Sequence, residues 1–300
     1  MSTKKEEISE WFRQLQHNIC TELEAEDGKA KFVEDNWERP GGGGGRTRVI
    51  QHGNAFEKGG VNFSAVHGEL SENIVKALGI SSNEFFATGV SIVIHPINPF
   101  VPIIHMNVRY FELADGTYWF GGGIDLTPHY VQEADARFFH SQLKIACDKF
   151  DAAYYSKFKN WADDYFFIPH RKETRGVGGI FFDRLKEDSS KSKTDIWNFV
   201  QAVGETFAPT YRHIVSKNKN QPYSDSNLQW RNLRRGRYVE FNLVYDKGTK
   251  FGLETDGRVE SILMSLPENA SWFYNFEPEP NGAEARTLAL LVKGTDWASN

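Results

Sequence analysis

Two short segments of the sequence combine the alternation of a strand with side chains that can do chemistry. Gly89–His95 and Ile103–Phe111 alternate with a period of two, and prolines 96 and 99 break the chain between them. The short connection favours an antiparallel pair. If the registers match, one sheet face carries five polar residues: Ser91, His95, His105, Asn107 and Arg109. A solvated face is the usual explanation, but imidazole, amide and guanidinium groups also suit ligand binding and proton transfer.

A third predicted strand, Tyr118–Leu126, contains three consecutive glycines at 121–123. Glycine inside a strand indicates a bulge or the close approach of another group. Asp125 follows the glycines. It is either a turn aspartate ahead of Thr127-Pro128 or a carboxylate aimed at a flat ligand on a stretch of bare backbone.

The histidines offer a second kind of chemistry. None of the nine falls in a short metal-binding motif, and only His95 and His105 are brought together by the predicted hairpin. A cluster with His140 and His170 would bind a divalent ion only if the fold gathers these residues. Two cysteines are too few for a Cys-rich zinc site, and no Gly-x-Ser-x-Gly elbow is present.

Basic residues gather late in the chain. Between positions 229 and 237 there is no acidic residue, and four arginines occur: Arg231, Arg234, Arg235 and Arg237. Such runs are usually solvated, which favours an exposed loop. The alternative is a docking site for carboxylates or phosphates, which arginine binds through two parallel hydrogen bonds.

The remaining pattern predicts the elements that position these residues. Helices are expected over Glu6–Leu23, over Glu133–Trp161 as one helix or two, over Thr194–Lys217 with a kink or split at Pro209, and over Ala283–Val292. Gly41–Gly45 is expected to be a mobile loop, and Lys186–Lys193 a surface loop. Strands are expected over 237–245, 250–254 and 258–266, joined by turns. This pattern favours one α+β domain with a mostly antiparallel sheet.

Composition excludes several classes of protein. The 300 residues are 40% apolar, 25% charged and 14% aromatic, with a net charge of −5. This excludes a disordered chain and disfavours a general nucleic-acid binder. The mean hydropathy is −0.52, and the longest apolar runs are far shorter than the ~20 residues of a membrane span. Two cysteines and an acidic N-terminal segment without an apolar core predict a cytoplasmic protein.

Six motifs resemble those of the oxygen-dependent coproporphyrinogen-III oxidase family, and they occur in the expected order. They are HMNVRYFE at 105–112, WFGGGIDLTP at 119–128, DYFFIPHR at 164–171, RGVGGIFFD at 175–183, RGRYVEFNLVYD at 235–246 and ESILMSLP at 260–267. The resemblance extends from about Trp37 to the C-terminus.

The resemblance implies a function and an assembly. Members convert two propionates of coproporphyrinogen III to vinyl groups, which gives protoporphyrinogen IX, CO2 and reduced oxygen in haem synthesis. O2 is the co-substrate, and no organic cofactor is implied. The implied fold is a single domain over 1–300 with a large antiparallel sheet between helical layers. Residues 1–36 form an N-terminal helical segment, and residues 238–272 resemble a β-meander at the interface of a homodimer.

The resemblance also assigns roles to individual residues. His105 matches a catalytic proton donor, and Asp125 matches an aspartate that faces the pyrrole nitrogens, while Arg109 is expected to hold a carboxylate. The matched substrate contacts are Ser91, Asn107, Val108, Arg109, Asp256, Gly257 and Arg258. The matched ligands of a divalent cation, which bacterial members assign, are His95, His105, His140 and His170.

Two other functions stay open on the sequence alone. A non-catalytic tetrapyrrole-binding protein would use the arginines but would not need Asp125. An iron-dependent oxygenase would use His95, His105 and a carboxylate as metal ligands.

Overall fold

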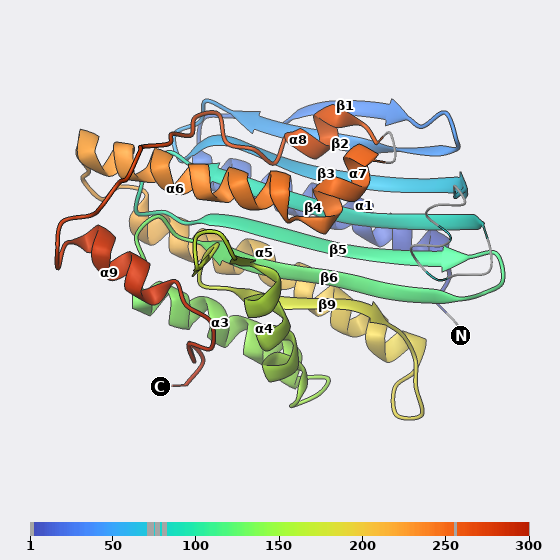
Figure 1. Ribbon diagram of the computed structural model, residues 1–300. Coiled ribbons are helices and arrows are strands. Elements are labelled where there is room, and N and C mark those ends of the chain that lie inside the picture. Colours follow the sequence, from blue (N-terminus) through green and yellow to red (C-terminus); the bar gives the residue numbers. More distant parts are fainter. Residues whose placement is uncertain (1–2, 71–74, 76–78, 80–82, 255–256, 300) are drawn as a thin grey trace.

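The computed structural model describes residues 3–70, 75, 79, 83–254 and 257–299, and it is organised around one large sheet (Figure 1). Seven antiparallel strands follow the order β1-β2-β3-β4-β5-β6-β9. Their bounds are β1 Val33–Glu38, β2 Gly43–Gln51, β3 Phe56–Glu69, β4 Glu84–Pro96, β5 Ile103–Leu113, β6 Tyr118–Thr127 and β9 Gly179–Leu185. A two-stranded ribbon, β7 Phe167–Ile168 with β8 Glu173–Thr174, lies outside this sheet. The predicted α+β class is confirmed.

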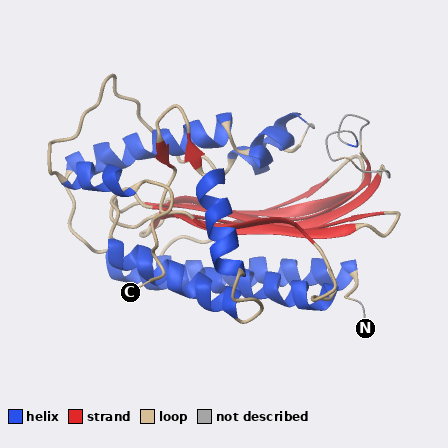
Figure 2. Cartoon of the chain, turned by 60° about the horizontal axis from the view of Figure 1, so that its bottom comes forward, coloured by secondary structure: helices blue, strands red, loops and turns tan. Residues whose placement is uncertain are grey.

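One face of the sheet is covered by long helices (Figure 2). They are α1 Lys5–Asp27, α3 Glu133–Asp148 and α5 Lys193–Asn218, with α4 Tyr154–Tyr165 against β9. Ile104, Met106 and Val108 of β5 are fully buried in the main hydrophobic core that this face shares with the helices. Burial of this alternate set explains why period-two patterning located the strands. The segment predicted as one helix or two is two helices, and α5 is not split at Pro209.

The opposite face carries a second, smaller helical layer. It consists of α6 Asp225–Val244, α7 Lys247–Glu254, α8 Val259–Leu263 and α9 Ala283–Leu290 (Figure 1). The predicted meander over 237–266 is therefore wrong, and so is the β-meander expected within 238–272. Helix α6 begins at a capping box of Ser224 and Asn227, and its buried positions recur three to four residues apart, as at Trp230, Leu233, Arg237 and Phe241. The alternation at 237–245 is only a fragment of this helical pattern.

The glycine run is part of a strand. The prediction of a mobile loop at 41–45 is wrong for Gly43–Gly45, which begin β2. Gly43 has a φ of +77°, and a Cβ at Gly45 would lie 2.3 Å from the ring of Trp37. The glycines let the first strands approach closely and turn sharply.

The arginine run lies on α6 and is buried, so the predicted solvated loop is wrong. Arg231 and Arg235 both bind the carboxylate of Glu57, while Arg234 binds Glu173 at 2.7 Å. Arg237 binds Glu240 at 3.0 Å. Arg231, Arg234 and Arg235 therefore attach α6 to the rest of the chain, whereas Arg237 pairs within the helix. The alternative of a free docking site does not fit these contacts.

The sulfur atoms of the described residues lie in the interior. Cys20 and Cys147 are both buried as free thiols, and Met106 and Met264 are buried too. Within the described ranges, no helix is long and apolar enough to cross a membrane.

We predict that Glu57→Gln destabilises the fold by roughly 3 to 5 kcal/mol, because Arg231 and Arg235 would lose the carboxylate that compensates their burial. The measurement is the free energy of unfolding in urea. The half-exposed Glu34, which pairs with Arg48, is the control, and Glu34→Gln should cost less than about 1 kcal/mol. Equal losses in the two variants would contradict the role given to Glu57.

Candidate active site

The register of β4 and β5 brings the predicted polar residues onto one face. Ser91 is paired with Asn107, and the neighbouring pairs are Val93 with His105 and Gly89 with Arg109. Since side chains alternate between faces, the polar side chains of Ser91, His105, Asn107 and Arg109 point away from the main core. Val108 is the exception among the predicted contacts, because its side chain is fully buried on the other face.

Strand β6 continues this face with bare backbone. Asn107 is opposite Gly123, Arg109 is opposite Gly121, and His105 is opposite Asp125. Glycine at these two positions leaves a flat strip of backbone that neighbouring side chains cover: Arg109 and Asp183 lie over Gly121, and Phe181 lies over Gly123. The glycine strand and the polar face are therefore neighbours in the sheet.

A buried relay of three side chains ends this strip. His105 Nδ1 lies 2.8 Å from Asp125 Oδ1, and Asp125 Oδ2 accepts a hydrogen bond of 2.7 Å from Arg175 Nη2. The side chain of Asp125 is 3% exposed and that of His105 is 23% exposed. Both carboxylate oxygens are occupied, so the expected direct contact of Asp125 with a ligand does not fit this geometry. His105 is the member of the relay that faces outward.

The charges of Asp125 and Arg175 determine which ring nitrogen of His105 carries the hydrogen. Burial raises the pKa of Asp125, but the opposing effects of Arg175 and His105 are larger and hold that pKa below its ordinary value. Burial acts against the charge of Arg175, yet Asp125 raises the pKa of this guanidinium. An ionised Asp125 can only accept, so Nδ1 of His105 carries the hydrogen and Nε2 of a neutral ring has a lone pair.

Arg175 was not identified as a site residue from the sequence. It is held by the amide oxygen of Asn242 at 3.0 Å and by the faces of three aromatic rings, whose centroids lie within 5.1 Å. These rings are Phe166, Tyr238 and Phe241. The residues around Arg175 come from the end of α4, from α6 and from β6. No local sequence pattern therefore identifies them.

Arg109 stands in the middle of the face. Its Nη1 donates to Asn107 Oδ1 at 2.7 Å, and its Nη2 donates to Asp183 Oδ1 at 2.8 Å. Both partners of this ion pair are about one-third exposed, in contrast to the buried relay. Beyond Arg109, the rings of Phe85, Phe111 and Trp119 stack across the same face. Sequence reasoning missed both Asp183 and this aromatic ladder.

Two of the three predicted contacts at 256–258 lie in the described part of the chain. Asp256 is outside the described residues, and Gly257 packs against Gly252 and Ile262. Arg258 binds Asp35 of β1 and donates to Ser261 Oγ at 2.9 Å. Ser261 in turn contacts Thr47 of β2 and accepts a hydrogen bond of 2.7 Å from Asn62 of β3, which is paired with Ser91.

The four histidines proposed as metal ligands are separate. His95 Nε2 donates to Ser265 O, whereas His140 contacts Tyr155 and Val177 with its two ring nitrogens. His170 contacts Tyr245 and Glu240. In the part of the chain that the structure describes, no three His, Cys, Asp or Glu residues lie close enough to hold a metal ion. The expected four-histidine site does not fit this arrangement.

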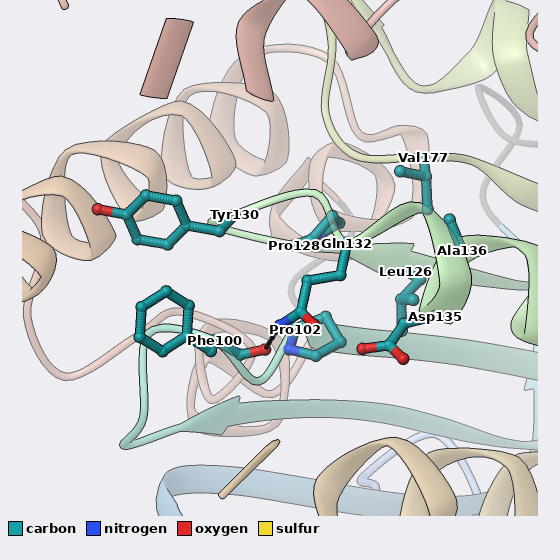
Figure 3. A pocket seen from close by; sticks show the side chains of 9 residues that line it. All are labelled: Phe100, Pro102, Leu126, Pro128, Tyr130, Gln132, Asp135, Ala136 and Val177. Atoms are coloured by element: carbon teal, nitrogen blue, oxygen red, sulfur yellow. Dashed lines mark hydrogen bonds between the residues drawn. The ribbon is translucent and has the colours of Figure 1, made fainter. Parts of the chain in front are cut away.

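A narrow cavity lies beyond the end of β6 and is distinct from this face. Its volume is about 10 Å³, enough for one water molecule. Figure 3 shows Gln132 between two aromatic rings, Phe100 and Tyr130, on one side and Asp135 on the other. A shallow hollow of about 230 Å³ adjoins it at Arg286 and Thr287. Neither is lined by His105 or Arg109.

Comparison with known proteins gives one consistent result. A family profile described as "Coproporphyrinogen III oxidase" matches residues 7–297. The chain is 47% identical to "Oxygen-dependent coproporphyrinogen-III oxidase" of Prochlorococcus marinus (strain NATL1A), over 95% of this chain and 88% of that protein. It is also 47% identical to chloroplastic proteins of Glycine max and Arabidopsis thaliana, named "Oxygen-dependent coproporphyrinogen-III oxidase" and "Coproporphyrinogen-III oxidase 1", over 95% of this chain and 77% of each.

We predict that Glu240 makes the free energy of unfolding fall more steeply as the pH is lowered. Burial alone would raise the pKa of Glu240, but hydrogen bonds from Arg171, His170 and Trp272 lower it to about 2, from an ordinary value of 4.5. A depressed carboxyl pKa stabilises the fold above the unfolded value and loses that effect as the pH falls. The stability difference between the protein and Glu240→Gln should therefore be full above pH 4.5 and shrink toward pH 2.

Urea unfolding across this range measures that difference. Glu133→Gln is the control, because Glu133 is exposed on α3 and its loss should give no such slope. A pH-independent difference for Glu240→Gln would count against the assignment.

Proposed function

The chain belongs to the coproporphyrinogen III oxidase family, and we propose that it converts two propionates of coproporphyrinogen III to vinyl groups with O2 as the oxidant. The products are protoporphyrinogen IX, CO2 and reduced oxygen, a step of haem biosynthesis. The observation that carries this proposal is the His105–Asp125–Arg175 relay, beside Arg109 and the glycine strip of β6.

The sheet face suits the chemistry of this substrate. Coproporphyrinogen III presents flat pyrrole rings and four carboxylates. Gly121 lets the side chain of Arg109 lie against the backbone of β6, and Arg109 offers a guanidinium to one propionate. Ser91 and Asn107 supply polar groups beside it, and we propose them as substrate contacts.

The chemical balance defines what the protein must do. Each propionate loses CO2 and one β-hydrogen, and the two electrons released pass to O2, which takes up protons to become hydrogen peroxide. We propose that the electron-rich pyrrole reacts with O2 directly, without an organic cofactor, and that the resulting peroxide removes the β-hydrogen. The protein then supplies orientation and proton transfer, and no step is assigned to a metal ion.

His105 carries the proton transfer in this mechanism. Its Nε2 lone pair can accept the pyrrole N–H proton, which makes the ring more electron-rich, and can return a proton to the reduced oxygen. Asp125 acts through His105, because it fixes the tautomer and stabilises the charged imidazole. Arg175 keeps Asp125 ionised in a buried position.

Assembly and location are further parts of the proposal. We propose a homodimer that uses residues 238–272, because this region exposes large apolar side chains outside the main core. They are Leu243, Val244, Leu253, Val259 and Trp272. We also propose a cytoplasmic location, in line with the acidic N-terminal segment and few cysteines. The substrate is soluble and polyanionic, so no membrane attachment is required.

We expect turnover to depend on O2. Incubation of the chelator-treated protein with coproporphyrinogen III should give protoporphyrinogen IX in air, measured after oxidation as porphyrin fluorescence, and none under anaerobic conditions. Product that forms only when iron is restored would favour an iron-dependent oxygenase instead. Binding of the substrate in air without any product would favour a non-catalytic tetrapyrrole-binding protein.

We expect Asp125→Asn to reduce kcat by roughly 10²- to 10⁴-fold, in the range seen when such a carboxylate is neutralised. Arg175 can only donate, so it will hold the amide oxygen and leave the amide NH2 facing His105. That reverses the tautomer and removes the lone pair from Nε2. Asp164→Asn is the control, since Asp164 is an exposed carboxylate paired with Lys293. Full kcat in folded Asp125→Asn would remove the relay from the mechanism.

A further inference from the structure

Asp183 forms the second Arg–Asp pair of the sheet face, and nothing in the proposed mechanism uses it. Its Oδ1 accepts a hydrogen bond of 2.8 Å from Arg109 Nη2. A Cβ at Gly121 would lie 2.6 Å from that oxygen and 2.7 Å from the arginine nitrogen. The ion pair therefore rests directly on the bare backbone of β6, at the centre of the strip.

The backbone of β9 is distorted at this position. Phe182 is paired with Gly122 and Leu185 with Phe120, so Asp183 and Arg184 together oppose the single residue Gly121. Arg184 has a φ of +50°, which is unfavourable for a residue with a side chain. Such a bulge redirects a side chain, and strain of this kind concentrates at functional positions. Here the bulge directs Asp183 onto Arg109.

The Asp125–Arg175 and Arg109–Asp183 ion pairs differ in solvent exposure, and this difference indicates different roles. Asp125 and Arg175 are 3% and 2% exposed at their side chains, and breaking that pair would leave a buried charge. Arg109 and Asp183 are 36% and 35% exposed, and ion pairs that open to solvent contribute little to stability. The first pair is a fixed part of the fold, whereas the second can open at small cost.

We propose that Asp183 is a positioning residue that exchanges with the substrate carboxylate on Arg109. Resting on the proposed function, the cycle is as follows. A propionate displaces Asp183 from Arg109 on binding. Oxidation by O2 then releases its carboxylate as CO2 and leaves a vinyl group on the pyrrole, and Asp183 recovers the guanidinium. Asp183 thus weakens the bound substrate state and stabilises the state in which the carboxylate has gone.

Asp183→Asn tests the exchange, because the amide no longer competes as a charge. We expect affinity for coproporphyrin III, the fluorescent tetracarboxylate used as a probe, to rise about two- to fivefold, the range that an exposed ion pair provides. KM should fall by a similar factor, and kcat should fall with it. A purely structural role would instead lower kcat alone or raise KM. Because Asp183 is one-third exposed, the variant is expected to fold, which urea unfolding checks.

Two variants serve as matched controls. Asp183→Glu keeps the charge and should keep wild-type affinity within experimental error. Asp188→Asn removes one negative charge from the exposed segment after β9 without touching Arg109, and should leave affinity unchanged. Unchanged or weaker binding by Asp183→Asn, or an equal gain for Asp188→Asn, overturns the exchange.

The binding measurement tests the exchange on Arg109 separately from the oxidase activity. If the wild-type protein binds coproporphyrin III but shows no O2-dependent turnover, the oxidase assignment fails and the binding measurement still decides the exchange. If turnover is present and the affinity of Asp183→Asn is unchanged, only the exchange fails. If the wild-type protein does not bind the probe, the exchange is overturned.

Discussion

The buried contact between Asp125 and Arg175 is the constraint on which the active face depends. Neither group could remain charged in the interior alone, because each would lose its hydration without compensation. Together they join the end of β6 to the turn before β9, and Asn242 with the rings of Tyr238 and Phe241 adds helix α6 to the same point. The orientation of His105 is a consequence, because its Nδ1–H has a single fixed acceptor.

Local periodicity made the central sheet predictable. Strands β4, β5 and β6 alternate residues that are buried against the helices with residues that face the site, so their sequences carry the period directly. The same alternation is enough to predict that His105, Asn107 and Arg109 share one face. Helix α6 was not predictable in this way, because four of its buried positions are arginines, which a hydropathy pattern counts as exposed.

The parts of the site that escaped prediction are those that depend on distant partners. Nothing near Arg175 in the sequence indicates the carboxylate 50 positions earlier that it binds, and the arginines of α6 find Glu57 across an even longer separation. Asp183 was equally hidden, because its direction is set by a bulge opposite Gly121. The family resemblance supplied residue types and roles, but the burial of Asp125 follows only from the packed structure.

The placement of sulfur has a consequence for an enzyme that would release peroxide at every turnover. Peroxide attacks thiolates, and burial raises the pKa of both Cys20 and Cys147 to about 12, which keeps these groups protonated. Met106 and Met264 are likewise shielded from solvent. The sulfur atoms of these four residues are therefore sheltered from the peroxide that the enzyme would release.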